Sequence, residues 1–353
     1  MKANSSKQIF VKLLTSEFFI LIMSAVYYVV IGIISPRMFS GNMINNIFQN
    51  MWPLLAGCLG QTFVLLLGGI DLSQTSVISL CSVVSGILLG GKFQELKFGT
   101  SPLWGNLIKE SGGVFSGLPE ITGTVLAIVV VLLVGTLIGC INGLFIAKLN
   151  MPPFMTTLIS QMLWAAIALW LVSSQNCTGL NPSFNFLGKG KLGGFIYMPF
   201  LIVIILLIIC EMLLSKTVFG KWIYCVGSNS RAAVVSGIPK NLVIVCVYSI
   251  SGFCAAVASV LYTGRQMMGR PTIGDGMLND ILGATVIGGV SMYGGKGKAV
   301  WALYGVLFYC IMTTSMNMLH LNSFLTQAVK GCIILLAVSL DVVRTSIQQR
   351  MTK

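Results

Sequence analysis

Long apolar runs alternate along this chain with shorter segments rich in Gly, Lys and Arg. A helix needs about 20 apolar residues to cross the hydrocarbon core of a bilayer. Several runs reach that length, and others are short or interrupted by glycines. The pattern predicts an all-α polytopic membrane protein of about ten transmembrane helices, some broken or re-entrant, in a single transmembrane domain over 1–353. The apolar runs cover 18–34, 54–70, 77–91, 121–147, 155–172, 195–214, 242–262, 299–316 and 324–343, and a Gly-rich run covers 283–298.

Composition supports this class, because 56% of the residues are hydrophobic and 9% are charged, whereas soluble domains carry roughly 25% charged residues. The formal net charge is +13. In a soluble chain such a charge would indicate a nucleic-acid partner. Here the basic residues gather in short loops and near both ends, as the positive-inside rule describes. We therefore expect contact with membrane lipid and no nucleic acid.

The first apolar run follows a basic segment, MKANSSKQIFVK, and no A-x-A cleavage site comes after it. We expect an uncleaved first span rather than a signal peptide. An even number of spans places both termini on one side, which holds about 13 Lys and Arg against about 8 opposite. This predicts cytoplasmic termini, with 92–120 and 175–194 as exposed loops.

A polar, basic segment at 216–241 separates two long apolar runs. Its local chemistry predicts a short helix over 231–236 with both ends marked. Asn229 and Ser230 are good N-cap residues. Gly237 suits the left-handed position after the last turn, and a proline two residues later prevents continuation.

This short helix would present a small surface, with Ala232 and Ala233 side by side and Val234 and Val235 behind them. Such a surface lets the groove of another protein approach the backbone closely. An ordinary amphipathic loop helix would show the same pattern. Local chemistry alone leaves both interpretations open.

Three acidic residues lie in or beside apolar runs: Asp71, Asp280 and Asp341. A charged side chain at the bilayer centre costs about 2.5–3.5 kcal/mol on insertion scales, so each should face protein, water or a helix end. Asp71 either caps the helix that follows it or acts on a solute or a conformational switch. Asp280 suits an N-terminal helix position, and Asp341 is expected to be a boundary charge near Arg344. These acids keep an ion-coupled carrier as an alternative.

Glycine spacing indicates where helices approach closely or break. Glycines at 135, 139 and 143 fall on one helix face and favour close helix packing in lipid. Two glycine pairs either absorb a hinge motion, since glycine tolerates unusual backbone angles, or only allow tight packing. The pairs are Gly68-Gly69 and Gly288-Gly289.

Polar residues inside apolar runs are candidates for the lining of a solute path, although interhelical hydrogen bonding explains them equally well. A stiff Met-Pro-Pro-Phe turn precedes the run at 155–172 and adds a proline to the candidates for a hinge or the path. The candidates are Gln61, Thr62, Asn142, Pro153 and Gln161.

Enzyme signatures do not occur in the sequence. The single histidine, His320, has no Cys or acidic cluster at ligand spacing, so we expect no metal site. The 10 cysteines form no C-x-x-C pair, and Cys177 is the thiol that we expect to be exposed. No G-x-S-x-G occurs. The nearest match to a P-loop, GILLGGKF at 86–93, lacks the final Ser or Thr, so this chain should bind no cofactor and any ATP should bind another chain.

Five blocks resemble, in the expected order, the permease subunit of the ribose, xylose and galactoside class of ABC importers. They are GGIDLSQTS (68–76), INGLFIAKLNMPPFMTTL (141–158), TVFGKWIYCVGSNSRAAVVSGIPK (217–240), IGGVSMYGGKGKAVWALYG (287–305) and QAVKGCIILLAVSLD (327–341). Together they extend over most of the chain.

The resemblance implies a dimeric pore without catalysis of its own, built from two copies or from a copy and a paralogue. It implies a cytoplasmic ATPase that binds ATP and Mg, and an extracytoplasmic sugar-binding protein. The family's E-A-A-x-x-x-G coupling motif falls on Arg231-Ala232-Ala233 and Gly237, which makes 216–241 the expected cytoplasmic coupling loop. The expected coupling residues are Gly220, Gly227, Asn229, Arg231, Ala232, Ala233 and Gly237.

Two departures from the family pattern affect this expectation. Arg231 replaces the usual acidic residue, so at least one contact with the ATPase should differ in polarity. The segment 276–280 lacks the Glu-Leu that sugar permeases often carry. A pentose or hexose moved by alternating access is the expected cargo, and nucleosides or branched-chain amino acids are the nearest alternatives. Two alternative hypotheses of function come from other classes of protein. They are an ion-coupled secondary transporter and a membrane scaffold that transports nothing.

Overall fold

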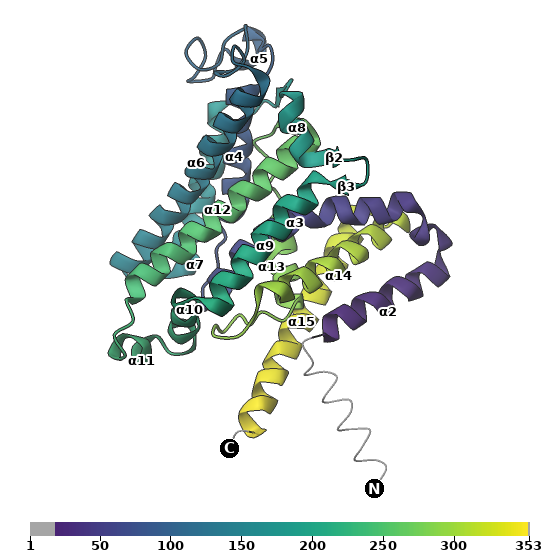
Figure 1. Cartoon of the computed structure of the whole chain (residues 1–353), viewed down its shortest axis with the longest axis vertical. Coiled ribbons are helices and arrows are strands. Elements are labelled where there is room, and N and C mark those ends of the chain that lie inside the picture. The colour runs from purple at the N-terminus through teal and green to yellow at the C-terminus, as the bar shows by residue number, and fades with distance from the viewer. Residues whose placement is uncertain (1–17, 352–353) are drawn as a thin grey trace.

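The computed structural model describes residues 18–351, with side chains described up to residue 339, and within this range the chain is predominantly helical (Figure 1). Its basic N-terminal segment and the side chains of Asp341 and Arg344 lie outside the described part. The helices are α2 (Phe19–Ile34), α3 (Gly41–Leu66), α4 (Gln74–Leu89), α5 (Glu95–Phe98), α6 (Glu120–Lys148), α7 (Pro153–Leu171), α8 (Pro182–Lys189), α9 (Met198–Lys216), α10 (Val218–Ser228), α11 (Ser230–Val235), α12 (Lys240–Gln266), α13 (Met277–Ile287), α14 (Ala299–Met318) and α15 (Ser323–Met351), with a 3₁₀ turn at Pro36–Phe39.

Four two-residue strands form two small antiparallel pairs. The strand β1 (Cys177–Thr178) pairs with β4 (Met268–Gly269), and β2 (Lys191–Leu192) pairs with β3 (Ile196–Tyr197). These pairs hold loops against helix ends and form no larger sheet among the described residues. The predicted all-α class is therefore confirmed.

Among the described residues, five helices are long and apolar enough to cross a membrane: α6, α7, α9, α12 and α14. Four shorter apolar helices accompany them, namely α2, α4, α13 and the first part of α15. Each predicted apolar run overlaps one helix of the structure. A polytopic membrane protein is the class that these helices define, while the number of ten spans stays a prediction.

The helix α3 begins well before the predicted start of its apolar run. The Ser40 side chain accepts a hydrogen bond from the Met43 amide and starts the helix at Gly41. Asparagines in the first turns of α3 lower its hydropathy, so the apolar pattern does not include residues 41–53. The interior Pro53 is tolerated in a helix whose second half is enclosed by other helices.

The helix α12 lies at the centre of the molecule, against α3, α4 and α6. Three glycines on α6 make the last of these contacts close, as the sequence predicts. A Cβ at Gly135 would lie 2.6 Å from the Gly252 carbonyl oxygen, and one at Gly139 would overlap the Tyr248 carbonyl. Because these glycines have no side chains, the backbones of α6 and α12 can touch.

Figure 1 shows α11 and the C-terminal end of α15 at one end of the molecule, and α5 at the other. We call these the α11 end and the α5 end. Cys177 of β1 is fully buried. The prediction of an exposed thiol there was wrong, because the β1–β4 pairing presses Cys177 against Gly86 of α4. The exposed described thiols are Cys225 and Cys332.

Candidate functional site

The short helix α11 has the two marked ends that its sequence predicts. The Asn229 side-chain oxygen accepts hydrogen bonds from the amides of Arg231 and Ala232 at 3.1 and 3.0 Å. At the other end Gly237 has φ +80°. The Gly237 amide donates to the Val234 carbonyl, and the Ile238 amide donates to the Ala233 carbonyl five residues earlier, both at 3.0 Å. This pair of bonds is a Schellman motif, which stops the helix.

The two sides of α11 differ from the predicted surface. Ala233 is buried, with 3% of its surface exposed, and packs toward the body of the protein. Val235 is 89% exposed and Val234 is 53% exposed. A six-residue helix turns its third and fourth residues to different faces, so Ala232 and Ala233 do not share one surface. The face open to a partner consists of Arg231, Ala232, Val234 and Val235.

The helix α10 carries α11 and is fixed at both of its ends. At its start, the Thr217 hydroxyl accepts a hydrogen bond from the Gly220 amide at 3.1 Å. A Cβ at Gly220 would overlap the Leu214 carbonyl of α9, so glycine allows the tight turn between the two helices. The direction of α10 is therefore set by α9.

The far end of α10 meets two other segments backbone to backbone. A Cβ at Gly227 would overlap the Leu66 carbonyl at the end of α3 and would lie 2.9 Å from the Gly295 amide nitrogen. The Gly295 amide itself donates to the Leu66 carbonyl at 2.9 Å. A Cβ at Gly294 would lie 2.7 Å from the Gly227 carbonyl oxygen. We call Leu66, Gly227, Gly294 and Gly295 the glycine junction.

Tyr224 adds a polar bond beside the glycine junction. Its hydroxyl donates to the Gly297 carbonyl at 2.7 Å. Burial, with a smaller contribution from the charge of Glu211, raises the pKa of Tyr224 to about 12, so the phenol keeps the proton that it donates. The end of α10 is thus tied to the loop between α13 and α14.

Both glycine pairs lie where helices break. Gly68 has φ +77° and closes α3, with its amide donating to the Leu65 carbonyl at 2.8 Å. Gly289 has φ +102° just after α13, and a Cβ at Gly288 would overlap the Trp301 carbonyl. A Cβ at Gly69 would lie 2.8 Å from the Tyr248 hydroxyl. Unusual backbone angles and tight packing therefore occur together, and a hinge motion stays a prediction.

Asp71 is buried in a network of hydrogen bonds between three helices. One carboxylate oxygen accepts from the Ser73 amide at 3.0 Å and hydroxyl at 2.6 Å, and the other accepts from the Ser251 hydroxyl at 2.6 Å. Gln74 donates to the Ser251 hydroxyl at 2.7 Å, and Asn142 donates to the Ser73 hydroxyl at 2.9 Å. The network joins α4, α6 and α12.

This geometry corrects the predicted cap. The helix α4 begins at Gln74 with Ser73 at the N-cap position, so Asp71 bonds the residue before the helix and not the amides of its first turn. Its partner on α12 lies far away in the sequence. Only the packing of α12 against α4 brings that hydroxyl to the carboxylate.

The remaining predicted path residues differ in their hydrogen bonding. Gln161 donates to the Thr75 hydroxyl at 3.3 Å, and Thr62 donates to a carbonyl of its own helix. Gln61 is fully buried, and neither polar atom of its amide has a hydrogen-bond partner among the described residues. Pro153 is the first residue of α7, where its fixed φ suits a helix start. Hydrogen bonding between helices accounts for Asn142 and Gln161, but not for Gln61.

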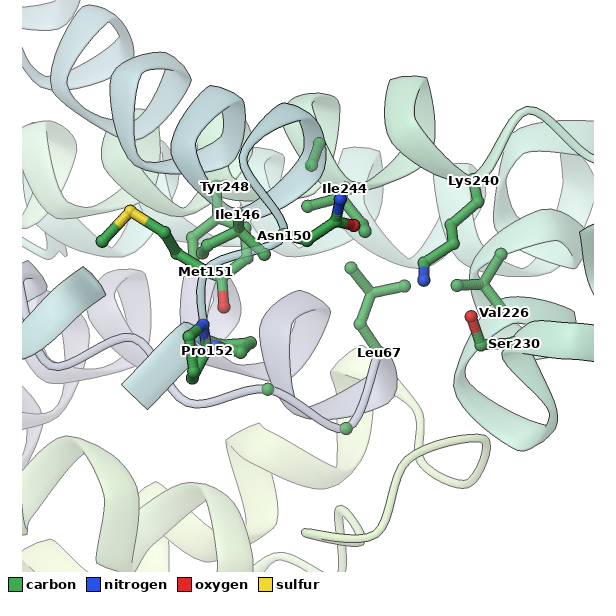
Figure 2. A pocket seen from close by; sticks show the side chains of 14 residues that line it. Leu67, Ile146, Asn150, Met151, Pro152, Val226, Ser230, Lys240, Ile244 and Tyr248 are labelled. Atoms are coloured by element: carbon green, nitrogen blue, oxygen red, sulfur yellow. The ribbon is translucent and has the colours of Figure 1, made fainter. Parts of the chain in front are cut away.

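A cavity of about 310 Å³ lies where several of these features meet (Figure 2). It is bounded by the break after α3, the turn between α6 and α7, the end of α10 and the start of α12. Lys240 extends into it from the start of α12, and Tyr248 faces it from further along that helix. The Tyr248 hydroxyl is buried and has no hydrogen-bond partner among the described residues. The break after α3 and the predicted coupling loop at 216–241 thus border one cavity.

Asp280 lies in the first turn of α13, as predicted, and is joined to a residue to which the sequence assigned no role. The Lys330 ammonium of α15 lies 2.9 Å from an Asp280 carboxylate oxygen. A lysine inside the last apolar run is a signal in the sequence, but its partner cannot be identified there. No group of three or more His, Cys, Asp or Glu side chains suited to a metal occurs in the described part of the chain.

The long apolar helices and the breaks between them define a polytopic membrane protein. A comparison with known families gives the more specific assignment. The family described as branched-chain amino acid transport system / permease component matches residues 42–338. The chain belongs to this family, and it is a component of a transport system rather than an enzyme.

Curated relatives cover nearly the whole chain. The ribose import permease protein of Bacillus subtilis (strain 168) is 32% identical over 89% of this chain and 88% of its own length. The D-allose transport system permease protein of Escherichia coli (strain K12) is 30% identical over 92% and 90%. The fructose import permease protein of Rhizobium meliloti is 26% identical over 91% and 83%. No solved structure matches the chain.

Proposed function

We propose that this chain is the permease subunit of an ABC importer for a small sugar, a pentose or a hexose. An extracytoplasmic binding protein delivers the sugar, and a separate cytoplasmic ATPase, which binds ATP and Mg, drives the transport. The relatives support the cargo, since those compared above are named for ribose, allose and fructose. The observation that carries the proposal is α11, a capped helix that projects at one end and is joined through α10 to the glycine junction.

The ATPase docks on the open face of α11, formed by Arg231, Ala232, Val234 and Val235. The positive charge of Arg231 favours an acidic group on the ATPase at that contact. The Asn229 cap and the Schellman motif hold the six residues of α11 in a helix. The coupling segment therefore transmits movement as a rigid element.

Movement of α10 reaches the pore through the glycine junction. Gly227 touches the end of α3, where Gly68 begins the helix break, and it touches the loop that follows Gly289. Both breaks contain backbone angles that only glycine adopts easily. A displacement of α10 changes the angle between the segments on either side of each break, and the pore alternates between its two openings.

The proposed orientation places the α11 end in the cytoplasm. The C-terminal end of α15 lies at the same end of the molecule (Figure 1), and an even number of spans would put both termini on that side. The α5 end then faces the binding protein. The pore forms between this chain and a second permease, either a copy or a paralogue, in the bacterial cytoplasmic membrane.

The test is co-purification of tagged protein from gently solubilised membranes, comparing the native chain with Gly237→Asp. We expect the native chain to bring down a P-loop ATPase and the variant to lose it. The matched control is Gly105→Asp. Both glycines have positive φ, +80° and +81°, and a Cβ at either has no neighbour within 4 Å, but Gly105 belongs to the loop that follows α5.

Loss of the ATPase in Gly237→Asp alone supports docking on α11. Equal loss in both variants would show that backbone strain, and not position, is responsible. If the native chain inserts normally and brings down no ATPase, the importer proposal fails. In that case uptake driven by an ion gradient should be measured, with Asp71→Asn as the variant that would abolish the coupling.

A further inference from the structure

The ion pair between Asp280 and Lys330 lies among three apolar helices. Lys330 of α15 approaches Asp280 of α13 at 2.9 Å, and the Tyr309 hydroxyl of α14 donates to the same carboxylate oxygen. The Lys330 ammonium also lies over the Tyr309 ring, 5.2 Å from its centre. One carboxylate therefore receives a cation and a phenol from two neighbouring helices.

This ion pair is only partly covered. The Asp280 side chain is 27% exposed and that of Lys330 is 16% exposed, whereas Tyr309 is 2% exposed. The phenol thus closes the inner side of the pair. The outer side of the carboxylate and of the ammonium can be reached by another molecule.

Polar residues continue along the same face of α15. Ser323, Gln327 and Lys330 follow one another at spacings of four and three, so they lie on one side of the helix, and the first two are exposed. One turn after Lys330 this face is apolar and packed, since a Cβ at Gly283 of α13 would lie 2.7 Å from Ile334. Lys330 meets Asp280 and Ile334 meets Gly283, so the two helices run in the same direction. The polar residues of α15 that precede Lys330 therefore extend past the first residue of α13. We call Ser323, Gln327, Lys330, Asp280 and the exposed Asn279 the α13–α15 patch.

The position of the α13–α15 patch follows from the direction of α15. This helix of 29 residues ends at the α11 end (Figure 1). Its first three turns, which include Lys330, therefore lie toward the α5 end. In the proposed orientation this is the side from which the sugar arrives.

An ion pair at such a place needs an explanation beyond stability. Removing two charges from water is costly, and their mutual attraction often does no better than apolar packing of the same volume. Ionisable side chains within membrane helices commonly mark the route of a polar solute. A carboxylate accepts hydrogen bonds from hydroxyl groups and an ammonium donates to them, so a partly exposed pair matches a molecule that carries several hydroxyls.

We propose that Asp280 and Lys330 form a recognition site for a hydroxyl-rich solute in the part of the path nearest the α5 end. Asp280 accepts from solute hydroxyls with its open carboxylate oxygen, and Lys330 donates to a neighbouring hydroxyl oxygen. Tyr309 holds the carboxylate in place from the inner side and is a positioning residue. This inference rests on the proposed function, because it assumes that a sugar passes this face of the chain.

The experiment is ATP-dependent uptake of D-ribose, D-allose and D-fructose by the complete importer in proteoliposomes, each sugar at a concentration below that of half-maximal native uptake. The main variant is the double substitution Asp280→Asn with Lys330→Gln, which leaves no unpaired charge. We expect uptake to fall about tenfold or more, since hydrogen bonds to charged groups are stronger than those to neutral ones. We also expect the ratio among the three sugars to change. The control is Cys332→Ser, an exposed position on α15 outside the patch, with uptake like that of the native chain.

A second variant separates recognition from a structural tie between α13 and α15. The exchange of Asp280→Lys with Lys330→Asp keeps an ion pair but reverses its donor and acceptor. We expect this exchange not to restore uptake, and its restoration to the native rate would overturn the inference. Native rates and ratios in the neutral double variant would overturn it as well.

Assembly is checked by co-purification of the ATPase. If the neutral variant does not assemble, Lys330→Arg serves in its place, because it keeps the pair and changes the donor geometry. An unchanged ratio among the sugars in that variant would also refute the site. If the native complex takes up none of the three sugars when ATP is supplied, the proposed function itself fails, and the inference fails with it.

Discussion

At the scale of single residues, some positions require glycine because another backbone occupies the space of a side chain. Gly227 is not one of the described glycines that have a positive φ. Its importance is that a Cβ would overlap the Leu66 carbonyl and crowd the Gly295 amide. Contact between three backbones, rather than conformational freedom, therefore requires glycine here.

Gly227→Ala should push α10 away from the end of α3. Overpacking of this kind costs about 1–3 kcal/mol of stability. We expect ATP hydrolysis by the reconstituted complex to continue while uptake falls, because α11 can still bind the ATPase but its movement no longer reaches the helix breaks. The measurement is the number of sugars moved per ATP hydrolysed. Gly117→Ala is the control, since a Cβ there has no neighbour within 4 Å, and an unchanged ratio in Gly227→Ala would contradict the role of the junction.

Asp71 is a second position where a single group matters. Its carboxylate accepts three hydrogen bonds. Asp71→Asn turns one acceptor into a donor that faces another donor, and the expected loss is about 1–3 kcal/mol. Thermal unfolding in detergent should show a lower midpoint. Ser249→Ala should not, because the Ser249 hydroxyl bonds only a carbonyl of its own helix among the described residues. A midpoint like that of the native chain in Asp71→Asn would show that the network contributes little.

At the scale of elements, α11 is a helix of six residues that depends on its ends. Two of its amides bond the Asn229 side chain, and two bonds close its C-terminus. Isolated helices of this length are unstable in water, so caps and packing have to hold it. The short element can serve as a contact for another protein only while these bonds persist.

Asn229→Ala should loosen α11 by about 1 kcal/mol, the usual effect of losing an N-cap. Hydrogen exchange of the amides at 231–236 should become faster, and less ATPase should co-purify. Ser236→Ala is the comparison, because Ser236 is exposed and follows the last turn. Equal exchange rates in the two variants would mean that packing against the protein, and not the cap, holds α11.

The sequence predicted most of these elements but not the directions of their faces. Both ends of α11 follow from residues within nine positions of one another, so local chemistry determines them. The burial of Ala233 does not, because it depends on how α11 lies against the protein. Similarly, hydropathy identified the apolar half of α3 and not its polar first turns, which begin at the cap formed by Ser40.

At the scale of the whole molecule, α10 and α11 of the proposed coupling loop lie toward one end, and α5 lies at the other (Figure 1). A membrane protein can use this separation to receive energy on one side and solute on the other. The Asp280–Lys330 pair joins α13 to the first turns of α15, away from the α11 end. The proposed importer therefore needs its two ends in different compartments.

The orientation can be measured with a thiol reagent that does not cross membranes. Cys225 is an exposed thiol of α10 near the α11 end, and Leu96→Cys would place another on α5, where Leu96 is 97% exposed. In intact cells we expect labelling at position 96 and not at Cys225, with the reverse in inverted vesicles. All proteins carry Cys332→Ser, which removes the other exposed described thiol, and Cys225→Ser identifies the signal of Cys225. Labelling of Cys225 in intact cells would place the coupling segment outside and exclude docking of a cytoplasmic ATPase.

The sequence by itself determined the membrane class, the helix breaks at glycine pairs and the two ends of α11. These depend on hydropathy and on backbone preferences, which act over a few residues. The tertiary structure alone decided that Cys177 is buried, that Gly227 touches Leu66 and that Lys330 pairs with Asp280. These contacts join residues distant in the chain, and the packing of helices against one another selects them. A sequence lists the charges and the glycines, but only the packed structure shows which of them meet.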